Sequence, residues 1–373
     1  MEFSTLPQQV VNGILLGSIY ALVALGYTMV YGVLRLINFA HGEVFMIGAY
    51  CALFTSWALG YTPNNTMPGG SYFTLLIMLL ASMVGCGLLG VLIERFAYRP
   101  LRSQPRIASL ITAIGLSLLL QYGGQVFLPI NQNIDARVNP LQGNFEVSFS
   151  RAAPVDNSKL QAEAAEAKKT FDEYIKTSKE DPFNLSAKGK ELRDAKFAAE
   201  RAAKQATGAA PAGLTVPRGR LLMVVITLVL MGALTYVVMF TRAGRAMRAA
   251  SHDFDAAALM GVNVDRIVTF TFLIGSVLAG AGAMMIGTFY SGTKIDTFFG
   301  LLLGVKAFVA AVLGGIGNIP GAVVGALLMG VTESLVIWAG YDQYKDAVAF
   351  VVLIVVLLFR PGGIFGSAKV EKV

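Results

Sequence analysis

The sequence has 373 residues, of which 55% are hydrophobic and 14% are charged, and its formal net charge is +7. A water-soluble domain carries about 25% charged residues, so this composition excludes an ordinary soluble enzyme. The basic residues do not gather into one patch, so the positive charge does not indicate binding of nucleic acid.

Nine apolar stretches follow one another along the chain. They cover residues 10–34, 37–59, 73–93, 107–128, 221–241, 267–290, 298–316, 319–339 and 347–359. Crossing the hydrocarbon layer takes about 20 apolar residues, and most of these stretches are that long. The sequence therefore predicts an all-α, polytopic membrane protein with eight or nine membrane segments. Nine crossings place the N-terminus outside, whereas eight, with one of the first two stretches only dipping into the bilayer, place it in the cytoplasm.

Three polar residues lie near the start of the second stretch, namely Asn38, His41 and Glu43. Asn38 and His41 are three residues apart and would share a helical face, whereas Glu43 would point elsewhere. Gly42 favours a break in the helix, and a broken helix presents free backbone groups to a cavity. Two interpretations stay open: a polar wall of a cavity, or a polar cap at a cytoplasmic loop that seats a partner.

A charged insertion separates the N-terminal membrane segments (1–129) from the C-terminal ones (219–373). Residues 131–220 hold 15 of the 30 Lys and Arg and 12 of the 23 Asp and Glu. Within it, residues 157–180 and 188–207 are rich in Ala, Glu and Lys and show heptad-like spacing. We expect an extracytoplasmic helical hairpin in the domain 130–218. It is either a solvated insertion without a role in transport or a contact surface for an external partner.

The positions of the arginines predict the orientation, since short cytoplasmic loops are enriched in Lys and Arg. The loop after the third stretch carries Arg95, Arg99 and Arg102, and the loop 242–266 is also basic. Both are expected in the cytoplasm, and the uncharged loop 60–72 is expected outside.

The loop 242–266 is the most informative segment outside the apolar stretches. Residues 244–260 read as a helix, and Gly261 permits a turn at its end. Ala256 and Ala257 are small and allow another surface to approach closely. Arg245 and Arg248 lie on a second, basic face. Such a helix suits a groove on a partner protein, or it lies on anionic lipid headgroups.

Two charged residues lie within late apolar stretches, Lys306 and Glu333. A charge inside the bilayer costs about 2.5–3.5 kcal/mol on the insertion scale, so such groups face protein or water. A pairing between the two would neutralise both. They form either a structural ion pair between helices or a contact for a solute.

Several kinds of reactive site are missing from the sequence. The two histidines lie far apart, and the sequence contains no H-E-x-x-H pair, no phosphate-binding loop and no G-x-S-x-G elbow. We therefore expect no enzyme activity, no metal and no cofactor. Any uphill movement of a solute would need an ion gradient or another subunit.

Several motifs carry a resemblance to a known family. The D-A-A-x-x-x-G core at 255–261 resembles the E-A-A-x-x-x-G loop of bacterial ABC importer permeases. Further segments are similar to the branched-chain amino acid permease subfamily, and in particular to its H-type subunit. They are 12–26 (NGILLGSIYALVALG), 37–43 (INFAHGE), 94–102 (ERFAYRPLR), 313–322 (LGGIGNIPGA) and the terminal VEKV at 370–373. The resemblance covers nearly the whole chain except about 133–217.

The resemblance implies a membrane subunit of an importer in the bacterial inner membrane. Such subunits associate with a second permease, two cytoplasmic ATPase subunits and a periplasmic solute-binding protein. They carry Leu, Ile, Val or related compounds inward, and close relatives handle urea and short amides. The residues that it places at the ATPase contact are Arg245, Arg248, Asp255, Ala256, Ala257 and Gly261. The candidates for the translocation path are Asn38, His41, Glu43, Lys306 and Glu333. The rival interpretation is a self-sufficient secondary transporter in which Lys306 and Glu333 form the coupling pair.

Overall fold

The computed structural model describes residues 5–62, 69–102, 104–148, 158–178, 213–290, 292–360 and 362–366, with a few single positions between 188 and 199. The elements of the first half are α1 (Leu6–Leu34), α2 (His41–Ala58), α3 (Tyr72–Ile93), a π-helical turn η2 (Glu94–Tyr98), a 3-10 turn η3 (Arg99–Leu101), α4 (Arg106–Phe127), η4 (Ala136–Val138), β1 (Asn144–Ser148) and α5 (Ser158–Ser178). The second half contains β2 (Gly213–Pro217), α7 (Arg218–Phe240), α8 (Arg242–His252), α9 (Phe254–Leu259), α10 (Val264–Phe289), α11 (Phe299–Gly314), α12 (Ile319–Trp338), η5 (Asp342–Tyr344) and α13 (Lys345–Phe359).

The chain divides into two compact units. The larger consists of residues 1–144 and 216–373, and the smaller of 145–215. Strands β1 and β2 pair into a two-stranded sheet, and α5 belongs to the smaller unit. Helix α5 corresponds to the first helix predicted in the insertion, at 157–180. The second predicted helix, at 188–207, lies almost entirely outside the described residues.

The larger unit is a bundle of apolar helices. Six helices in the described part of the chain are long and apolar enough to cross a membrane: Leu6–Leu34, Tyr72–Leu101, Ile107–Phe127, Arg218–Phe240, Val264–Phe289 and Ile319–Trp338. Helices α2, α11 and α13 are shorter, at 18, 16 and 15 residues. The prediction of a polytopic helical membrane protein is thus confirmed, whereas eight or nine crossings stays a prediction.

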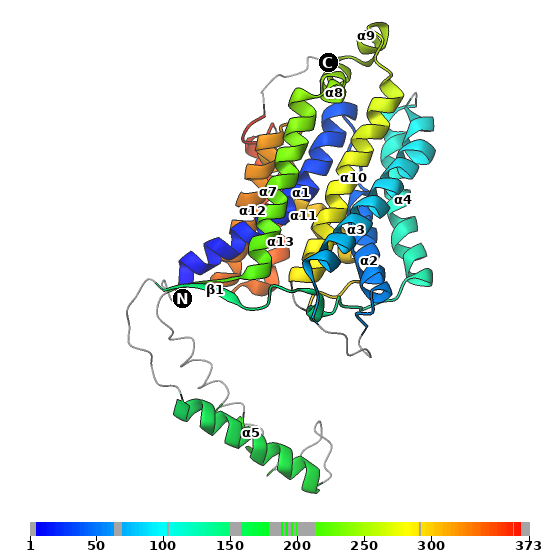
Figure 1. The fold of residues 1–373 in the computed structure, drawn as a ribbon. Coiled ribbons are helices and arrows are strands. Elements are labelled where there is room, and N and C mark those ends of the chain that lie inside the picture. The colour runs from blue at the N-terminus through cyan, green and yellow to red at the C-terminus, as the bar shows by residue number, and fades with distance from the viewer. Residues whose placement is uncertain are drawn as a thin grey trace. The chain divides into compact units, whose positions relative to one another are not determined.

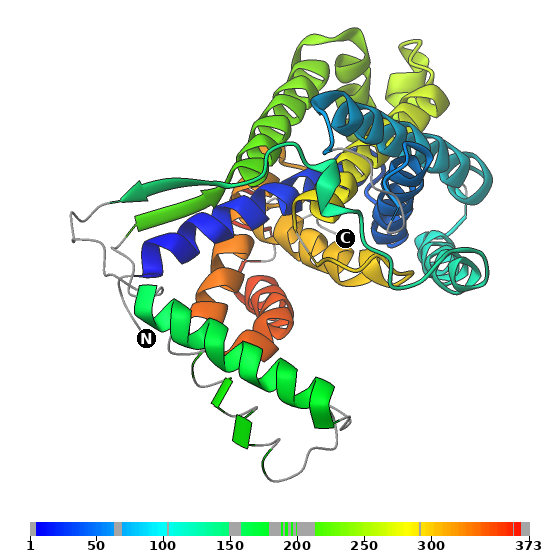
Figure 2. The same ribbon diagram turned by 60° about the horizontal axis from the view of Figure 1, so that its bottom comes forward.

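Helix α1 forms the centre of the bundle. It lies between α12 and α10, as the two views in Figures 1 and 2 show, and it packs against both as well as against α11. Its middle is buried on all sides, from Gly17 through Val30. A helix that is apolar around its whole circumference can be surrounded by others without leaving a polar face buried.

Close contact between α1 and α12 depends on residues without side-chain bulk. A Cβ atom added at Gly17 would lie 2.7 Å from the carbonyl oxygen of Ala326. A Cβ added at Gly330 would lie 2.4 Å from the carbonyl oxygen of Gly13. Small residues at such crossings allow the backbones of membrane helices to approach closely.

Helices α4 and α13 lie at the periphery and expose many apolar side chains. Leu119 and Phe127 of α4 are 66% and 85% exposed, and Leu358 of α13 is 73% exposed. These surfaces suit a hydrocarbon environment or another membrane helix.

Candidate functional site

The chain between α1 and α2 positions the first group of polar candidates. Arg35 ends α1 in the left-handed conformation, with φ of 53°, and α2 starts six residues later at His41. Asn38 therefore lies in a loop and does not share a helical face with His41. Its side-chain oxygen accepts hydrogen bonds from the hydroxyl of Tyr98 at 2.9 Å and from the backbone N–H of Ala40 at 3.1 Å. These contacts make Asn38 a brace for the loop.

His41 is buried in the packing between α1 and α2. Its ring centroid lies 4.7 Å from that of Tyr27. Gly26 leaves room for this ring, since a Cβ there would lie 2.3 Å from Nε2. His41 is 1% exposed and does not line the cavity described below.

The sequence predicts a helix break at Gly42, but Gly42 does not break the helix. It lies within α2, where a Cβ would meet the carbonyl oxygen of Gly300 at 2.7 Å. Gly304 lies against the same position, with its own added Cβ 2.7 Å from the Gly42 Cα. The glycine is therefore explained by the close crossing of α2 and α11, which needs no irregular backbone.

Glu43 points away from this crossing and toward α4. Its Oε1 accepts a hydrogen bond of 2.6 Å from the hydroxyl of Ser117 and another from the side-chain amide of Gln121. Its Oε2 is buried and has no hydrogen-bond partner among the described residues. A buried carboxylate oxygen without a hydrogen bond raises the free energy of the folded state. A solute that reached this atom and donated a hydrogen bond to it would remove that penalty.

A cavity of about 390 Å³ lies beside Glu43, between α1, α2, α4 and α11. Aromatic and aliphatic side chains form most of its wall. The lining residues are Tyr27, Phe39, Gly42, Glu43, Ile114, Ser117, Leu118, Gln121, Tyr122, Phe298, Leu301, Gly304, Val305 and Phe308. An apolar pocket with a few convergent polar groups is the usual form of a small-molecule site.

Ser117 and Gln121 were missed by the sequence analysis. They are four residues apart within the apolar stretch 107–128, so they share one face of α4. That polar pair in an apolar run was the signal that could have indicated them. Their connection to Glu43 could not be foreseen, because it depends on how α4 packs against α2.

Lys306 and Glu333 form a second buried cluster, in which the Nζ of Lys306 lies 2.7 Å from Oε1 of Glu333. Two further members of this cluster carry no signal in the sequence. The hydroxyl of Tyr20 donates to Oε2 of Glu333 at 2.8 Å, and Asp346 Oδ1 lies 2.6 Å from the Lys306 Nζ. The cluster thus joins α11, α12, α1 and α13. Lys306 and Glu333 have their partners within the chain, which favours a structural role for them.

The loop 242–266 folds as two helices, so the prediction of a single helix over 244–260 is wrong. The backbone of Asp253 is extended, with φ of −156°, and separates α8 from α9. The Asp253 side chain accepts hydrogen bonds from the backbone N–H groups of Asp255 at 2.8 Å and Ala256 at 3.0 Å. An Asp at this position is a strong N-cap, which explains why a new helix starts here.

The tip after α9 is the most exposed apolar part of this loop. Leu259 and Met260 are 89% and 85% exposed. Gly261 has φ of 84°, which confirms the expected turn at the helix end. Asp255 and Ala256 are exposed, but Ala257 is buried. Ala257 therefore packs within the chain and does not present a surface to a partner.

Arg245 and Arg248, two of the three arginines of α8, differ in their contacts. Arg245 is exposed. The guanidinium of Arg248 donates to the carbonyl oxygen of Val238 at the C-terminal end of α7. Since that carbonyl belongs to the last turn of α7, Arg248 also compensates the negative end of that helix.

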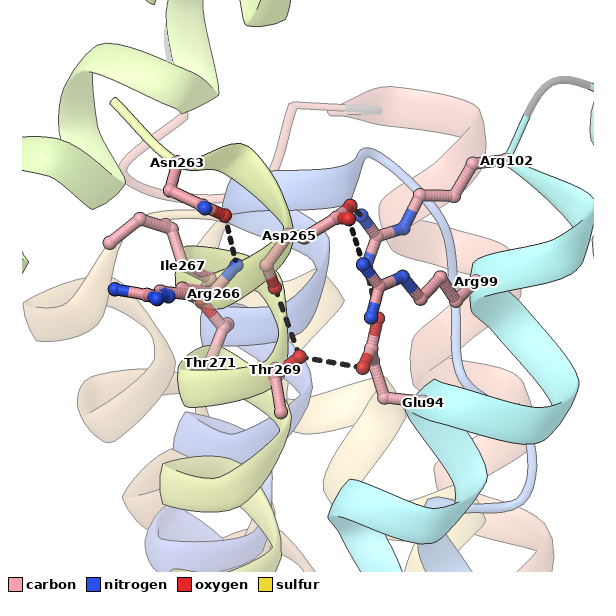
Figure 3. A network of polar contacts seen from close by, with 9 residues as sticks. All are labelled: Glu94, Arg99, Arg102, Asn263, Asp265, Arg266, Ile267, Thr269 and Thr271. Carbon is pink, nitrogen blue, oxygen red and sulfur yellow. Dashed lines mark hydrogen bonds and ion pairs between the residues drawn. The ribbon is translucent and has the colours of Figure 1, made fainter. Parts of the chain in front are cut away.

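A network of charged residues joins α3 and its continuation to α10 at the same end of the bundle (Figure 3). Arg102 lies between the carboxylates of Glu94 and Asp265, with 2.6 Å from Nη1 to Oδ1 of Asp265. Arg99 pairs with Asp265 as well. The hydroxyl of Thr269 donates to Oε2 of Glu94 at 2.7 Å. The network links the end of α3 to the first turns of α10, the helix that follows α9.

The chain matches a family model and several curated proteins. Residues 9–357 match the family described as "Branched-chain amino acid transport system / permease component". The chain is 38% identical to the high-affinity branched-chain amino acid transport system permease protein BraD of Pseudomonas aeruginosa, over 98% of this chain and 97% of that protein. It is 35% identical to the corresponding permease protein LivH of Escherichia coli K12, over 100% of this chain and 99% of that protein. No solved structure matches.

Proposed function

Because the chain belongs to the branched-chain amino acid transport permease family, we propose that it forms the membrane path of an ABC importer for branched-chain amino acids or similar small solutes. It would work in the bacterial inner membrane with a second permease, cytoplasmic ATPase subunits that hydrolyse ATP and a periplasmic solute-binding protein. The insertion 130–218 would face the periplasm.

The observation that carries the choice of site is the cavity beside Glu43. Leucine, isoleucine and valine each combine an ammonium group with a branched apolar side chain. The free Oε2 of Glu43 offers an acceptor for the ammonium, while Phe298, Phe308 and Leu301 offer an apolar wall. A charge-assisted hydrogen bond of this kind is about twice as strong as a neutral one.

Urea and short amides remain the second candidate class of solute. They carry no charge, and the cavity would then hold them by Ser117, Gln121 and a neutral carboxyl at Glu43. The carboxylate favours the amino acids, because a buried charge without a counter-ion is costly. Competition between labelled leucine and unlabelled urea for uptake separates the two classes.

A self-sufficient secondary transporter is disfavoured by the surroundings of Lys306. Its ammonium is engaged by Glu333 and Asp346, and the remaining Glu333 oxygen by Tyr20. A coupling pair would need to exchange these partners for an ion in each cycle, which is costly for buried charges.

The tip of α9 is the proposed contact for the ATPase. Leu259 and Met260 are nearly fully exposed, and Asp255, Ala256 and Arg245 lie exposed in the same loop. A short helix with an exposed apolar end suits a groove on a partner. Leu259→Asp should release the ATPase from the purified complex, whereas Tyr341→Asp, at a 57% exposed residue between α12 and α13, should not.

Reconstitution into lipid vesicles tests the proposal directly. The chain with the second permease and the ATPase subunits should accumulate labelled leucine when ATP and the binding protein are supplied. The two permeases without the ATPases should accumulate none. Uphill uptake without the ATPases, driven by an ion gradient, would show a secondary transporter instead.

A further inference from the structure

Two neighbouring cavities on the bundle surface differ sharply in chemistry. The first, of about 460 Å³, is lined by Arg95, Arg99, Asn263, Asp265, Arg266, Thr269, Phe270 and Leu273. The second, of about 260 Å³, is lined only by apolar residues, namely Leu230, Ala233, Leu234, Val237, Leu273, Ile274, Val277 and Leu278. Leu273 lines both, so the basic cavity and the apolar one adjoin at this residue.

One face of α10 forms the floor of both cavities. Arg266, Phe270, Leu273 and Val277 follow each other at spacings of four, three and four residues, which places them on one helical face. Helix α10 packs against both α3 and α7, and Figure 1 shows it between them. The stripe therefore runs from the arginine-rich end of α10 toward the middle of the bundle.

The basic cavity has an excess of positive charge. Asp265 is its one carboxylate among the described residues, and this group pairs with Arg99 and Arg102. Glu94 pairs with Arg102 as well. The cavity and its network thus contain four arginines (Arg95, Arg99, Arg102 and Arg266) but only two carboxylates (Glu94 and Asp265) among the described residues. The side chains of Arg95 and Arg266 form no ion pair within the described part of the chain. Figure 3 shows Arg266 outside the Asp265 network, on the other side of the first turn of α10.

We propose that these two cavities form one binding site for an anionic diacyl phospholipid such as phosphatidylglycerol. The phosphate would lie in the cavity that Arg95, Arg99 and Arg266 line, and one acyl chain would lie along Leu273 and Val277 against α7. The position of the basic cavity suits a lipid headgroup. The arginine-rich loops indicate that this end of α3 and α10 lies at the cytoplasmic membrane surface, where anionic lipid attracts basic residues. A free anion would use the first cavity and leave the second empty.

The site also has a consequence for the cytoplasmic contacts. The phosphate would sit beside Asp265, whose bonds to Arg99 and Arg102 join α10 to the end of α3. Helix α10 follows α9 in the chain, and Leu101 and Arg102 beyond the end of α3 line a cavity together with Ala250 and Phe254 of the loop 242–266. A bound lipid would therefore stabilise the framework from which α8 and α9 project.

Photolabelling of the full-length protein tests this proposal. The protein is reconstituted in phosphatidylcholine vesicles that contain a small share of phosphatidylglycerol with a photoreactive acyl chain. The labelled peptides should be those that contain residues 230–237 and 273–278. Photoreactive phosphatidylcholine should label them at least tenfold less, since it lacks the net negative charge.

Variants of the two arginines without an ion pair, compared with controls that remove the same charge elsewhere, make the test specific. Each of Arg95→Gln and Arg266→Gln should weaken the labelling about fivefold, because a basic residue at the membrane surface contributes about that much to binding anionic lipid. The double variant should approach the phosphatidylcholine level. The control pair Arg242→Gln and Arg360→Gln removes two exposed arginines elsewhere. Its photolabelling should stay within twofold of that of the unmodified protein. If the double variant does not fold, the two single variants decide.

Two further measurements distinguish a lipid from other ligands. Ala233→Trp fills the apolar cavity and should reduce labelling while both arginines stay in place. Inorganic phosphate at millimolar concentration should not compete with the lipid. Unchanged labelling in Arg95→Gln and Arg266→Gln, equal labelling by the two lipids, or complete displacement by phosphate would each overturn the proposal.

Discussion

Ser117 on α4 donates a hydrogen bond of 2.6 Å to the carboxylate of Glu43 on α2. This bond crosses between two helices that otherwise have a small contact, since α4 lies at the edge of the bundle. It also occupies one carboxylate oxygen, whereas the other has no hydrogen-bond partner among the described residues, and Glu43 lines the cavity. The position of α4 and the chemistry of the proposed solute site are therefore set by the same two residues.

Glu43→Gln should lower the uptake of leucine at least tenfold, with the complex still assembled. The amide keeps the size of the side chain but removes the negative charge, and hydrogen bonds to charged groups are worth about 1.5–3 kcal/mol. Initial rates of labelled leucine uptake measure the effect. Ser117→Ala should cost less, because Gln121 still holds the carboxylate. Equal uptake by Glu43→Gln and the unmodified protein would exclude Glu43 from the solute path.

Lys306→Met should destabilise the protein more than Glu333→Gln does. Loss of the lysine leaves Glu333 and Asp346 without their cation, whereas loss of the Glu333 charge leaves Lys306 paired with Asp346. Removing one partner of a buried ion pair costs about 3–5 kcal/mol. The thermal unfolding midpoints of the two variants in detergent measure which one is less stable. The double variant should be more stable than Lys306→Met alone, and the reverse order of the single variants would contradict the structural role.

Gly17→Leu should prevent correct packing of α1 against α12. A Cβ at this position already meets backbone atoms at 2.7 and 2.8 Å, which cannot move aside as a flexible side chain would. The control is Gly115→Leu on α4, where an added Cβ meets nothing within 4 Å. Protein level and thermal midpoint should fall in the first variant only. Leucine is a better helix former than glycine, so similar losses in both would indicate that added bulk at any glycine, and not this crossing, lowers stability.

Gly261→Val should separate ATP hydrolysis from uptake while membrane insertion stays normal. Gly261 has φ of 84°, a conformation that costs a β-branched residue about 1–3 kcal/mol. The turn would therefore shift and move Leu259 and Met260 from their positions. The control is Gly340→Val, which has nearly the same φ of 87° and open surroundings but lies outside the proposed ATPase contact. Coupled uptake in Gly261→Val at the level of Gly340→Val would contradict a role for this turn.

The charged groups illustrate how far the sequence could predict the site. Lys306 and Glu333 were identified as a pair because charges in apolar stretches need a counter-ion, and the structure places them 2.7 Å apart. Tyr20 and Asp346 were not foreseen. Tyr20 lies within the first apolar stretch and carries no charge, and Asp346 precedes the last apolar stretch by one residue. Their participation depends on the packing of α1 and α13 against α11 and α12.

The start of α2 was predicted less well, and the reason is the glycine at position 42. In a sequence, a glycine beside polar residues indicates a break as readily as a close helix crossing. The choice between them depends on Gly300 and Gly304, which are more than 250 residues away in the chain. The same holds for the single helix predicted over 244–260, where the local capping by Asp253 outweighed the continuous helical pattern.

The sequence by itself determined the class of molecule, the number and order of its apolar stretches and the location of its basic loops. These properties follow from composition and local spacing, because the lipid environment requires long apolar helices and the arginines stay at their ends. Only the tertiary structure decided which polar groups share a cavity and which neutralise each other. Those relationships depend on the rotation and crossing of helices that are distant in the chain, and an apolar helix surface of this kind carries little local information about which face meets which partner.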